Sequence, residues 1–346
     1  MKGLDSVLHS HRQGSRRTQA ITVGAVGLIG LVIAIVFSIS AGAKEIPLQL
    51  VWDAIFHYNP SETDQQIIHQ LRLPRAIAAV LVGAGLALSG AMMQGMTRNP
   101  LADPSILGVT QGSSLAIAVA FALVPGVSGL PLLLWSFGGA GLGIGLVLLI
   151  SSLAKAGLTP VKLALAGTAI GMLLSSLATV LSIRFQVAKD IAFWYAGGLA
   201  GTTWEQLTFV IPAAISGILI CLFIARSVTI LSFGDEMAVG LGSRTLWIKL
   251  AGMAAVLLMT GGAVSIAGTI GFLGLIVPHM TRALVGSDYK YILPCSAILG
   301  ALLLVLADLG ARMINPPYET PVSVVTALIG IPFFLYLARR EGRAFQ

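Results

Sequence analysis

The residues of this chain that could carry covalent or metal chemistry are few and widely separated. Its two cysteines, Cys221 and Cys295, lie inside apolar stretches, far from any second cysteine or histidine at a metal-binding or redox spacing. A phosphate-binding loop requires a Gly-Lys pair, and none of the seven lysines follows a glycine. We therefore expect no disulfide, no metal centre, no bound cofactor and no ATP hydrolysis by the chain itself.

The ionisable residues do not predict an ion path either. Ion-driven transporters usually place such residues near mid-membrane, often on broken helices. The apolar runs have no charge in their interiors, and Asp308 and Arg312 fall near the end of one run. His279 is the only titratable residue of its run, and we expect it at a helix end as an interfacial histidine. An ion-coupled secondary transporter is kept as the alternative, whereas the facing nucleophile and base of a membrane-embedded enzyme are not found.

Composition indicates which environment must position these residues. Asp, Glu, Lys and Arg make up 10% of the 346 residues, against about 25% in a soluble globular protein. Apolar residues make up 56%, and the mean hydropathy is +0.91. The net charge of +7 is spread between apolar runs instead of forming one basic patch. These values predict a bilayer protein without a nucleic-acid partner.

Charge-free runs predict the spanning helices, because a crossing needs about 20 apolar residues and a charge at the bilayer centre is costly. The run 104–154 would be more than about 70 Å long as one helix. Pro125 and Gly126, followed by Gly129 and Pro131, divide it into two. The eight runs are 18–43, 76–97, 104–154, 163–183, 206–225, 250–281, 291–307 and 320–338.

The charges of the two tails determine whether the second long run, 250–281, is one span or two. Residues 1–17 and 339–346 are both basic, so the positive-inside rule predicts two cytoplasmic tails around a permease domain at 18–338. An even number of spans follows, and the run 250–281 must turn once, near Gly261, Gly262 or Gly268. The prediction is an all-α polytopic protein with ten transmembrane helices. It places 15 of the 21 Lys and Arg residues on the cytoplasmic side.

The N-terminus also imitates a secretory signal that ends in Ala41-Gly42-Ala43. Its apolar stretch is longer than the roughly 7 to 15 residues of such a signal. We therefore expect an uncleaved first helix.

Glycines and one cytoplasmic segment complete the residue-based predictions. Glycine pairs four positions apart predict close helix packing: Gly108 and Gly112, Gly141 and Gly145, Gly167 and Gly171, and Gly197 and Gly201. The segment 227–245 is the longest internal cytoplasmic stretch, and its centre, 233–242, alternates acidic, small and apolar residues. This pattern fits a short amphipathic helix that docks on a partner and fits an interfacial turn equally well.

Five stretches spread over nearly the whole chain form a recognisable set: Arg72-Leu73-Pro74-Arg75, Asn99 to Val109, Gly234-Asp235-Glu236, Gly268 to His279 and Pro321 to Leu337. Together they resemble one family, the FecCD-type membrane permeases of type II ABC importers, which take up iron-siderophores, haem and cobalamin. Ser323 stands where glycine is expected and Thr320 where leucine is commoner, which affects only the packing of the last helix.

The resemblance implies the type II ABC importer permease fold in a bacterial cell membrane. It implies a homodimer or heterodimer of ten-helix subunits, two ATPase subunits that bind the ATP, and an extracytoplasmic substrate-binding protein. The transport mechanism would be alternating access, and a ferric siderophore would be the cargo because such systems dominate the family.

The resemblance also implies roles for individual residues. Arg72, Arg75 and Arg312 would receive acidic residues of the binding protein, since an Arg fork pairs well with a carboxylate. Asn99 and Leu101 would form a cytoplasmic gate, and the loop 157–161 would form another. Coupling to the ATPase would fall to Gly234, Asp235, Glu236, Ala238, Leu241 and Gly242.

Overall fold

The computed structural model describes residues 2–42, 46–153, 159–315 and 318–344, and every regular element in these ranges is a helix. Two π-helical turns, Ile68–Arg72 (η1) and Leu257–Gly261 (η3), and one 3-10 turn, Pro104–Leu107 (η2), adjoin the α-helices. The α-helices are α1 (Lys2–Ser40), α2 (Leu48–Phe56), α3 (Thr63–Ile67), α4 (Leu73–Thr97), α5 (Val109–Leu123), α6 (Gly129–Leu153), α7 (Pro160–Arg184), α8 (Ala188–Ala196), α9 (Trp204–Ser232), α10 (Asp235–Gly240), α11 (Thr245–Val256), α12 (Gly262–Ala267), α13 (Leu273–Val285), α14 (Tyr289–Ile314) and α15 (Val322–Ala344).

The all-α polytopic prediction is confirmed for the described residues. Seven helical stretches there are long and apolar enough to cross a membrane. Three shorter apolar helices, Val109–Leu123, Leu273–Val285 and Val322–Tyr336, lie where further spans were predicted. Val109–Leu123 and Leu273–Val285 fall short of the about 20 residues that a full crossing needs, whereas Val322–Tyr336 is the first part of α15, which continues to Ala344. The count of ten spans therefore stays a prediction.

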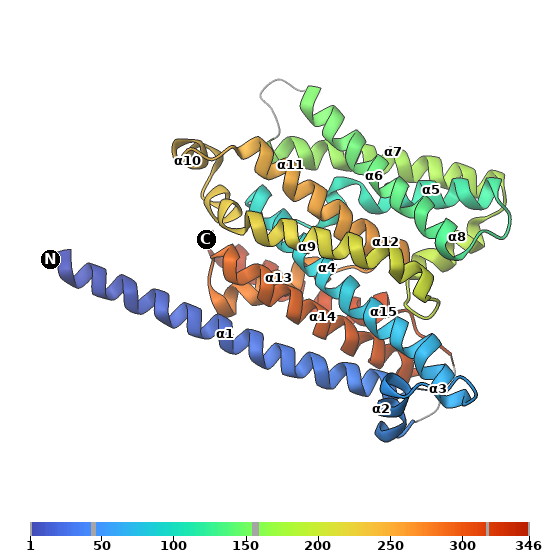
Figure 1. The fold of residues 1–346 in the computed structure, drawn as a ribbon. Coiled ribbons are helices and arrows are strands. Elements are labelled where there is room, and N and C mark those ends of the chain that lie inside the picture. Colours follow the sequence, from blue (N-terminus) through green and yellow to red (C-terminus); the bar gives the residue numbers. More distant parts are fainter. Residues whose placement is uncertain (1, 43–45, 154–158, 316–317, 345–346) are drawn as a thin grey trace.

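The described ends of α1 and α15 lie at the same end of the bundle as α10, and α2, α3 and α8 lie at the opposite end (Figure 1). This arrangement agrees with the prediction of two termini on one side. Helix α1 begins at Lys2, so the predicted tail 1–17 continues directly into the first span.

Both long runs are interrupted, as predicted, and the single break in the second lies at the last of the three glycines named for it. The first breaks between α5 and α6, where Pro125 and Gly126 stand. The second continues through Gly261 and Gly262, because η3 joins α11 to α12 without a turn. It breaks at Gly268, whose φ of 65° is a left-handed backbone conformation that glycine adopts readily.

Helix α4 runs through the middle of the bundle and packs against α14, α13, α9 and α11 (Figure 1). Close backbone contact makes this possible. A Cβ atom on Gly90 would overlap the backbone of Gly274 in α13, and one on Gly83 would overlap Gly300 in α14. Small residues of this kind allow helices to approach where no hydrophobic effect drives them together.

The predicted glycine pairs contribute unequally to packing. Gly112 of α5 lies against Gly139 of α6, and Gly108 lies against Gly143. A Cβ atom on Gly167 would overlap the carbonyl oxygen of Ile106. Gly145, in contrast, has no neighbour within 4 Å of an added Cβ. Spacing alone therefore identified the packing face of α5 at Gly108 and Gly112. It did not identify Gly139 and Gly143 of α6, which pack against that face.

Candidate functional site

The three arginines that the resemblance singled out lie together at the junction of α1, α4 and α14. Arg75 and Arg312 both pair with Asp308: Nη2 of Arg75 lies 2.9 Å from Oδ1, and Nη2 of Arg312 lies 3.2 Å from Oδ2. The Asp308 side chain is only 1% exposed. Arg75 also donates from Nη1 to Oε1 of Glu319, at 2.6 Å. A single buried carboxylate thus holds two guanidinium groups.

Arg72 and Arg312 fix the end of α1. Arg72 donates from Nη1 to the carbonyl oxygens of Ile39 and Ser40, at 2.6 and 2.7 Å. Arg312 donates from Nη1 to the carbonyl oxygen of Ser38, at 3.1 Å. The last carbonyl groups of a helix have no partner within the helix, so these bonds satisfy the end of α1.

All three arginines are therefore engaged inside the chain. Arg72 and Arg75 are each 8% exposed, and the side chain of Arg312 is 9% exposed. The Glu319 side chain, at 48%, is the exposed member of the group. In this conformation the arginines position helix ends, and docking of a binding protein on them stays a prediction.

The segment predicted to couple to an ATPase forms the short helix α10. Gly234 precedes it with a φ of 129°, and Asp235 and Glu236 occupy its first turn. Asp235 lies 3.0 Å from Nζ of the buried Lys249 and 3.8 Å from Nη2 of Arg98. These ion pairs tie α10 to α11 and to the end of α4.

One of the predicted coupling residues of α10, Ala238, does not lie on its exposed face. Ala238 is fully buried and belongs to the core of this chain, so it does not reach the surface. Met237, Val239 and Leu241 are 60%, 60% and 67% exposed. Gly242 follows with a φ of 76° and ends the segment. The residues that present an apolar surface are thus Met237, Val239 and Leu241.

The predicted gate residues lie in the turn after α4. Arg98 ends the helix in a left-handed conformation, with a φ of 54°. Oδ1 of Asn99 accepts a hydrogen bond from the backbone N–H of Leu101, at 2.9 Å. This bond makes a tight Asx turn and sends the chain back toward the bundle. The second predicted gate, 157–161, lies partly outside the described residues, which resume at Thr159.

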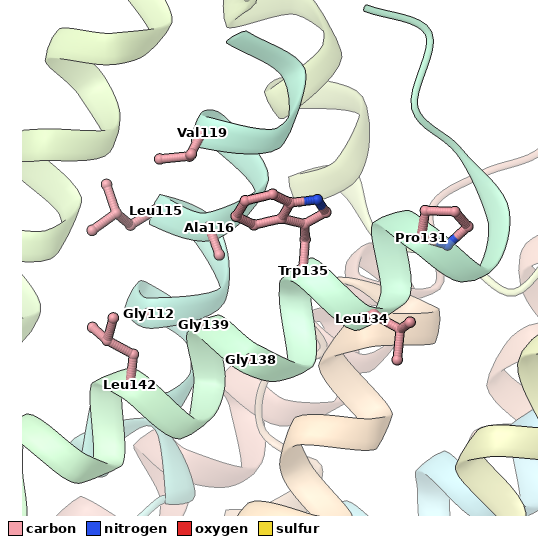
Figure 2. A pocket seen from close by; sticks show the side chains of 10 residues that line it. All are labelled: Gly112, Leu115, Ala116, Val119, Pro131, Leu134, Trp135, Gly138, Gly139 and Leu142. Atoms are coloured by element: carbon pink, nitrogen blue, oxygen red, sulfur yellow. The ribbon is translucent and has the colours of Figure 1, made fainter. Parts of the chain in front are cut away.

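A separate cavity, between two helices that carry none of these residues, is apolar. It has a volume of about 570 Å³ and lies between α5 and α6, with Trp135 of α6 facing Ala116 and Val119 of α5 (Figure 2). The indole N–H of Trp135 is the one polar side-chain group among its lining residues. Such a lining offers no ligand for a ferric ion and few partners for a polar chelate.

The sequence profile of the FecCD transport family matches residues 30–340. The chain belongs to the FecCD transport family. This permease is 58% identical, over 95% of its length and 86% of the relative's, to the iron(3+)-hydroxamate import system permease protein FhuB of Bacillus subtilis (strain 168). It is 39% identical, over 94% of its length and 97% of the relative's, to the ferric enterobactin transport system permease protein FepD of Escherichia coli (strain K12).

A solved structure of the same architecture supports the family assignment. It is described as a metal-chelate type ABC transporter in an inward-facing conformation, and it matches this permease with a TM-score of 0.81 and 32% identity. The match covers 92% of this chain and 99% of that one. The type II ABC importer permease fold that the resemblance implied is therefore confirmed. As a permease, this FecCD chain is not an enzyme.

Two acidic residues of this FecCD permease were not predicted as functional. Asp308 holds the arginine group together, and only its spacing of four positions before Arg312 indicated a pairing. Asp103 stands between two of the predicted runs, and the structure packs it against Gly274 of α13. No pattern in the sequence could have indicated that contact.

Proposed function

We propose that this chain is the membrane-spanning permease subunit of an ATP-binding-cassette importer that moves a ferric hydroxamate siderophore, or a related ferric chelate, into the cytoplasm. The observation that carries the proposal is the 58% identity, over 95% of the chain, to a permease of an iron(3+)-hydroxamate import system. The similarity to a metal-chelate type ABC transporter supports the same cargo class.

The chain acts in this proposal as one part of a larger assembly. It pairs with a second permease subunit, identical or homologous, and with two ATPase subunits and an extracytoplasmic binding protein. The ATPases bind the ATP, and this chain binds no cofactor. Exposed apolar residues of α10 support an ATPase contact, because Met237 and Leu241 are each at least 60% exposed. Both termini and α10 face the cytoplasm in this arrangement.

The open face of α7 supports a polar route through the assembly. Thr168, Ser176 and Thr179 are exposed there, and each hydroxyl donates to a carbonyl oxygen four residues earlier. A hollow of about 330 Å³ beside this face is lined in part by Gln111 and Ser175. Neutral hydroxyl and amide groups can contact a chelate without holding it tightly, which release into the cytoplasm requires.

Transport then follows alternating access. ATP binding closes the two ATPases, and their movement reaches the bundle through the 227–245 segment. The turn at Asn99 and Leu101 opens or closes the cytoplasmic end, while the binding protein delivers cargo near Arg72, Arg75 and Arg312. The alternative is an ion-coupled secondary transporter, which would work without ATPase subunits.

Uptake of ⁵⁵Fe-loaded chelates tests the cargo. Cells that lack this chain are compared with cells that carry it, using a ferric hydroxamate, a ferric catecholate and ferric citrate. We expect the hydroxamate to require the chain and unlabelled hydroxamate to compete best. Uptake of all three chelates at the same rate without the chain would contradict the proposal.

A further inference from the structure

The loop after α4 re-enters the bundle and carries a carboxylate to mid-membrane depth. A Cβ atom on Gly274 would lie 3.0 Å from the carbonyl oxygen of Leu86 and 3.5 Å from Oδ2 of Asp103. Leu86 lies eleven residues before the end of α4 at Thr97, which is about 16 Å along a helix. The hydrocarbon core of a bilayer is about 30 Å thick. Asp103 therefore lies near the middle of the membrane-spanning part of the bundle.

The half-buried Asp103 lines a small cavity of about 170 Å³, here called the Asp103 cavity. Several lining residues carry neutral oxygen atoms, and Asp103 is the only lining residue with an ionisable side chain. The lining residues are Leu86, Asp103, Pro104, Ser105, Thr110, Thr260, Val264, Thr269, Ile270, Gly271 and Gly274.

A second, independent feature of the cavity points to a ligand. Thr260 is 2% exposed, and its Oγ1 has no hydrogen-bond partner among the described residues. A buried hydroxyl without a partner costs free energy, and Thr260 stands on the π-helical turn η3, a local geometry that is frequent at functional sites. An unsatisfied hydroxyl and a mid-membrane carboxylate thus belong to residues that line the same cavity.

The charge of Asp103 is poorly compensated by the protein itself. Its Oδ1 accepts one hydrogen bond, from the backbone N–H of Ser105 at 2.9 Å, and none of the ion pairs in the described ranges includes it. An ionised carboxylate at this depth is costly unless it is paired. The chain between α12 and α13 is unwound from Gly268 to Phe272, and Thr269, Ile270 and Gly271 of this stretch line the cavity. Carbonyls of broken helices coordinate small cations in membrane proteins.

We propose that the Asp103 cavity binds one partly hydrated monovalent cation of the sodium type. One carboxylate with neutral hydroxyl and carbonyl oxygens balances a single positive charge. Calcium sites usually contain several carboxylates, and no group of three or more His, Cys, Asp or Glu residues occurs among the described residues to hold a transition metal. The cavity is larger than one bare ion, and a water takes about 30 Å³ of liquid volume, so the ion keeps some of its water.

The bound ion would join the re-entrant loop to the broken helix. Asp103 follows the predicted gate residue Leu101 by two positions, and Thr260 belongs to the α11–α12 span. An ion between them would hold that loop against α12 and α13. This inference goes beyond the proposed function, because it concerns an ion that is not the cargo.

Binding of ²²Na⁺ to the purified permease in its complex tests the inference directly. We expect saturable binding that unlabelled NaCl displaces and choline chloride does not. Asp103→Asn keeps an oxygen to accept the N–H of Ser105 but removes the charge, and it should weaken binding at least about tenfold. Thr260→Val removes only the hydroxyl and should weaken binding several-fold.

Two matched variants control for general damage. Asp288 caps Lys290 as Asp103 caps Ser105, and Asp288→Asn lies outside the cavity. Thr281→Val removes another buried hydroxyl, which donates to the carbonyl oxygen of Val277. Both should bind ²²Na⁺ normally. Absence of saturable binding in the unaltered protein, or equal binding after Asp103→Asn and Thr260→Val, would overturn the inference while leaving the transport proposal intact.

Discussion

Arg75 and Asp308 stand 233 positions apart in the chain and form a buried, multiply bonded ion pair. Nε of Arg75 donates to Oδ1 and Oδ2 of Asp308 at 3.0 and 3.1 Å, and Nη2 donates to Oδ1 at 2.9 Å. The pair joins the start of α4 to the end of α14. Its geometry explains why an Arg suits this position, since its planar fork can contact both carboxylate oxygens.

Breaking this pair should destabilise the permease strongly. Removing one partner takes away the main counter-charge of the other, while Asp308 keeps Arg312 and Arg75 keeps Glu319, so the loss should approach the about 3–5 kcal/mol of a broken buried ion pair. Arg75→Met and Asp308→Leu should each lower the midpoint of thermal unfolding of the purified chain. The double variant should be more stable than the two single effects predict, because neither Arg75 nor Asp308 then remains without the other. Strictly additive losses would show that the two side chains act independently.

The rate at which the binding protein associates with the importer should depend on Arg312. Charged groups near an interface mainly change the association rate and its salt dependence. Arg312→Gln should slow association of the binding protein with the assembled importer and reduce the effect of added salt. Association rates measured at several salt concentrations check this. Glu319→Gln, which removes the exposed negative charge of the same group, should instead speed association. Unchanged rates in both variants would contradict docking at this surface.

Coupling to the ATPase should depend on the exposed residues of α10. Met237→Arg and Leu241→Arg insert charge into an apolar contact face, so the ATPase should no longer co-purify while the chain stays folded. Ala238→Arg should instead unfold the chain, because Ala238 is fully buried in its core. Leu71→Arg, at an exposed position near the opposite end of the bundle, is the control and should keep the ATPase bound. Normal co-purification of Met237→Arg and Leu241→Arg would return α10 to the interpretation of an interfacial turn.

Substitution by alanine should have different effects at two glycines of α6. A Cβ atom on Gly139 would overlap the backbone of Gly112 and the side chain of Ala116, whereas one on Gly145 meets nothing within 4 Å. Overpacking of this kind costs about 1–3 kcal/mol. Gly139→Ala should therefore reduce the yield of folded protein and its thermal midpoint, and Gly145→Ala should not. Equal behaviour of the two variants would show that α5 and α6 are not in close contact.

Local sequence patterns predicted the helices, whereas the position of Asp103 and the buried face of α10 depend on tertiary contacts. The break at Pro125 and Gly126 could be predicted because both residues disfavour helix wherever they stand. The position of Asp103 could not, since it depends on contact with Gly274 in a helix that follows 170 residues later. The burial of Ala238 in α10 could not be predicted either. Helical spacing identifies the faces of a helix but does not tell which face packs against the core. The short helices α2 and α8 carry too few residues for a clear period.

Energy coupling is the property that most directly separates an ATP-driven importer from an ion-coupled transporter. The measurement is uptake of a ⁵⁵Fe-loaded hydroxamate siderophore into proteoliposomes that contain this permease, its partner permease, the ATPases and the binding protein. Identical salt on both sides and an uncoupler remove every ion gradient. We predict uptake that requires ATP and persists without any gradient. Uptake driven by an imposed proton or sodium gradient in the absence of ATP would contradict the account.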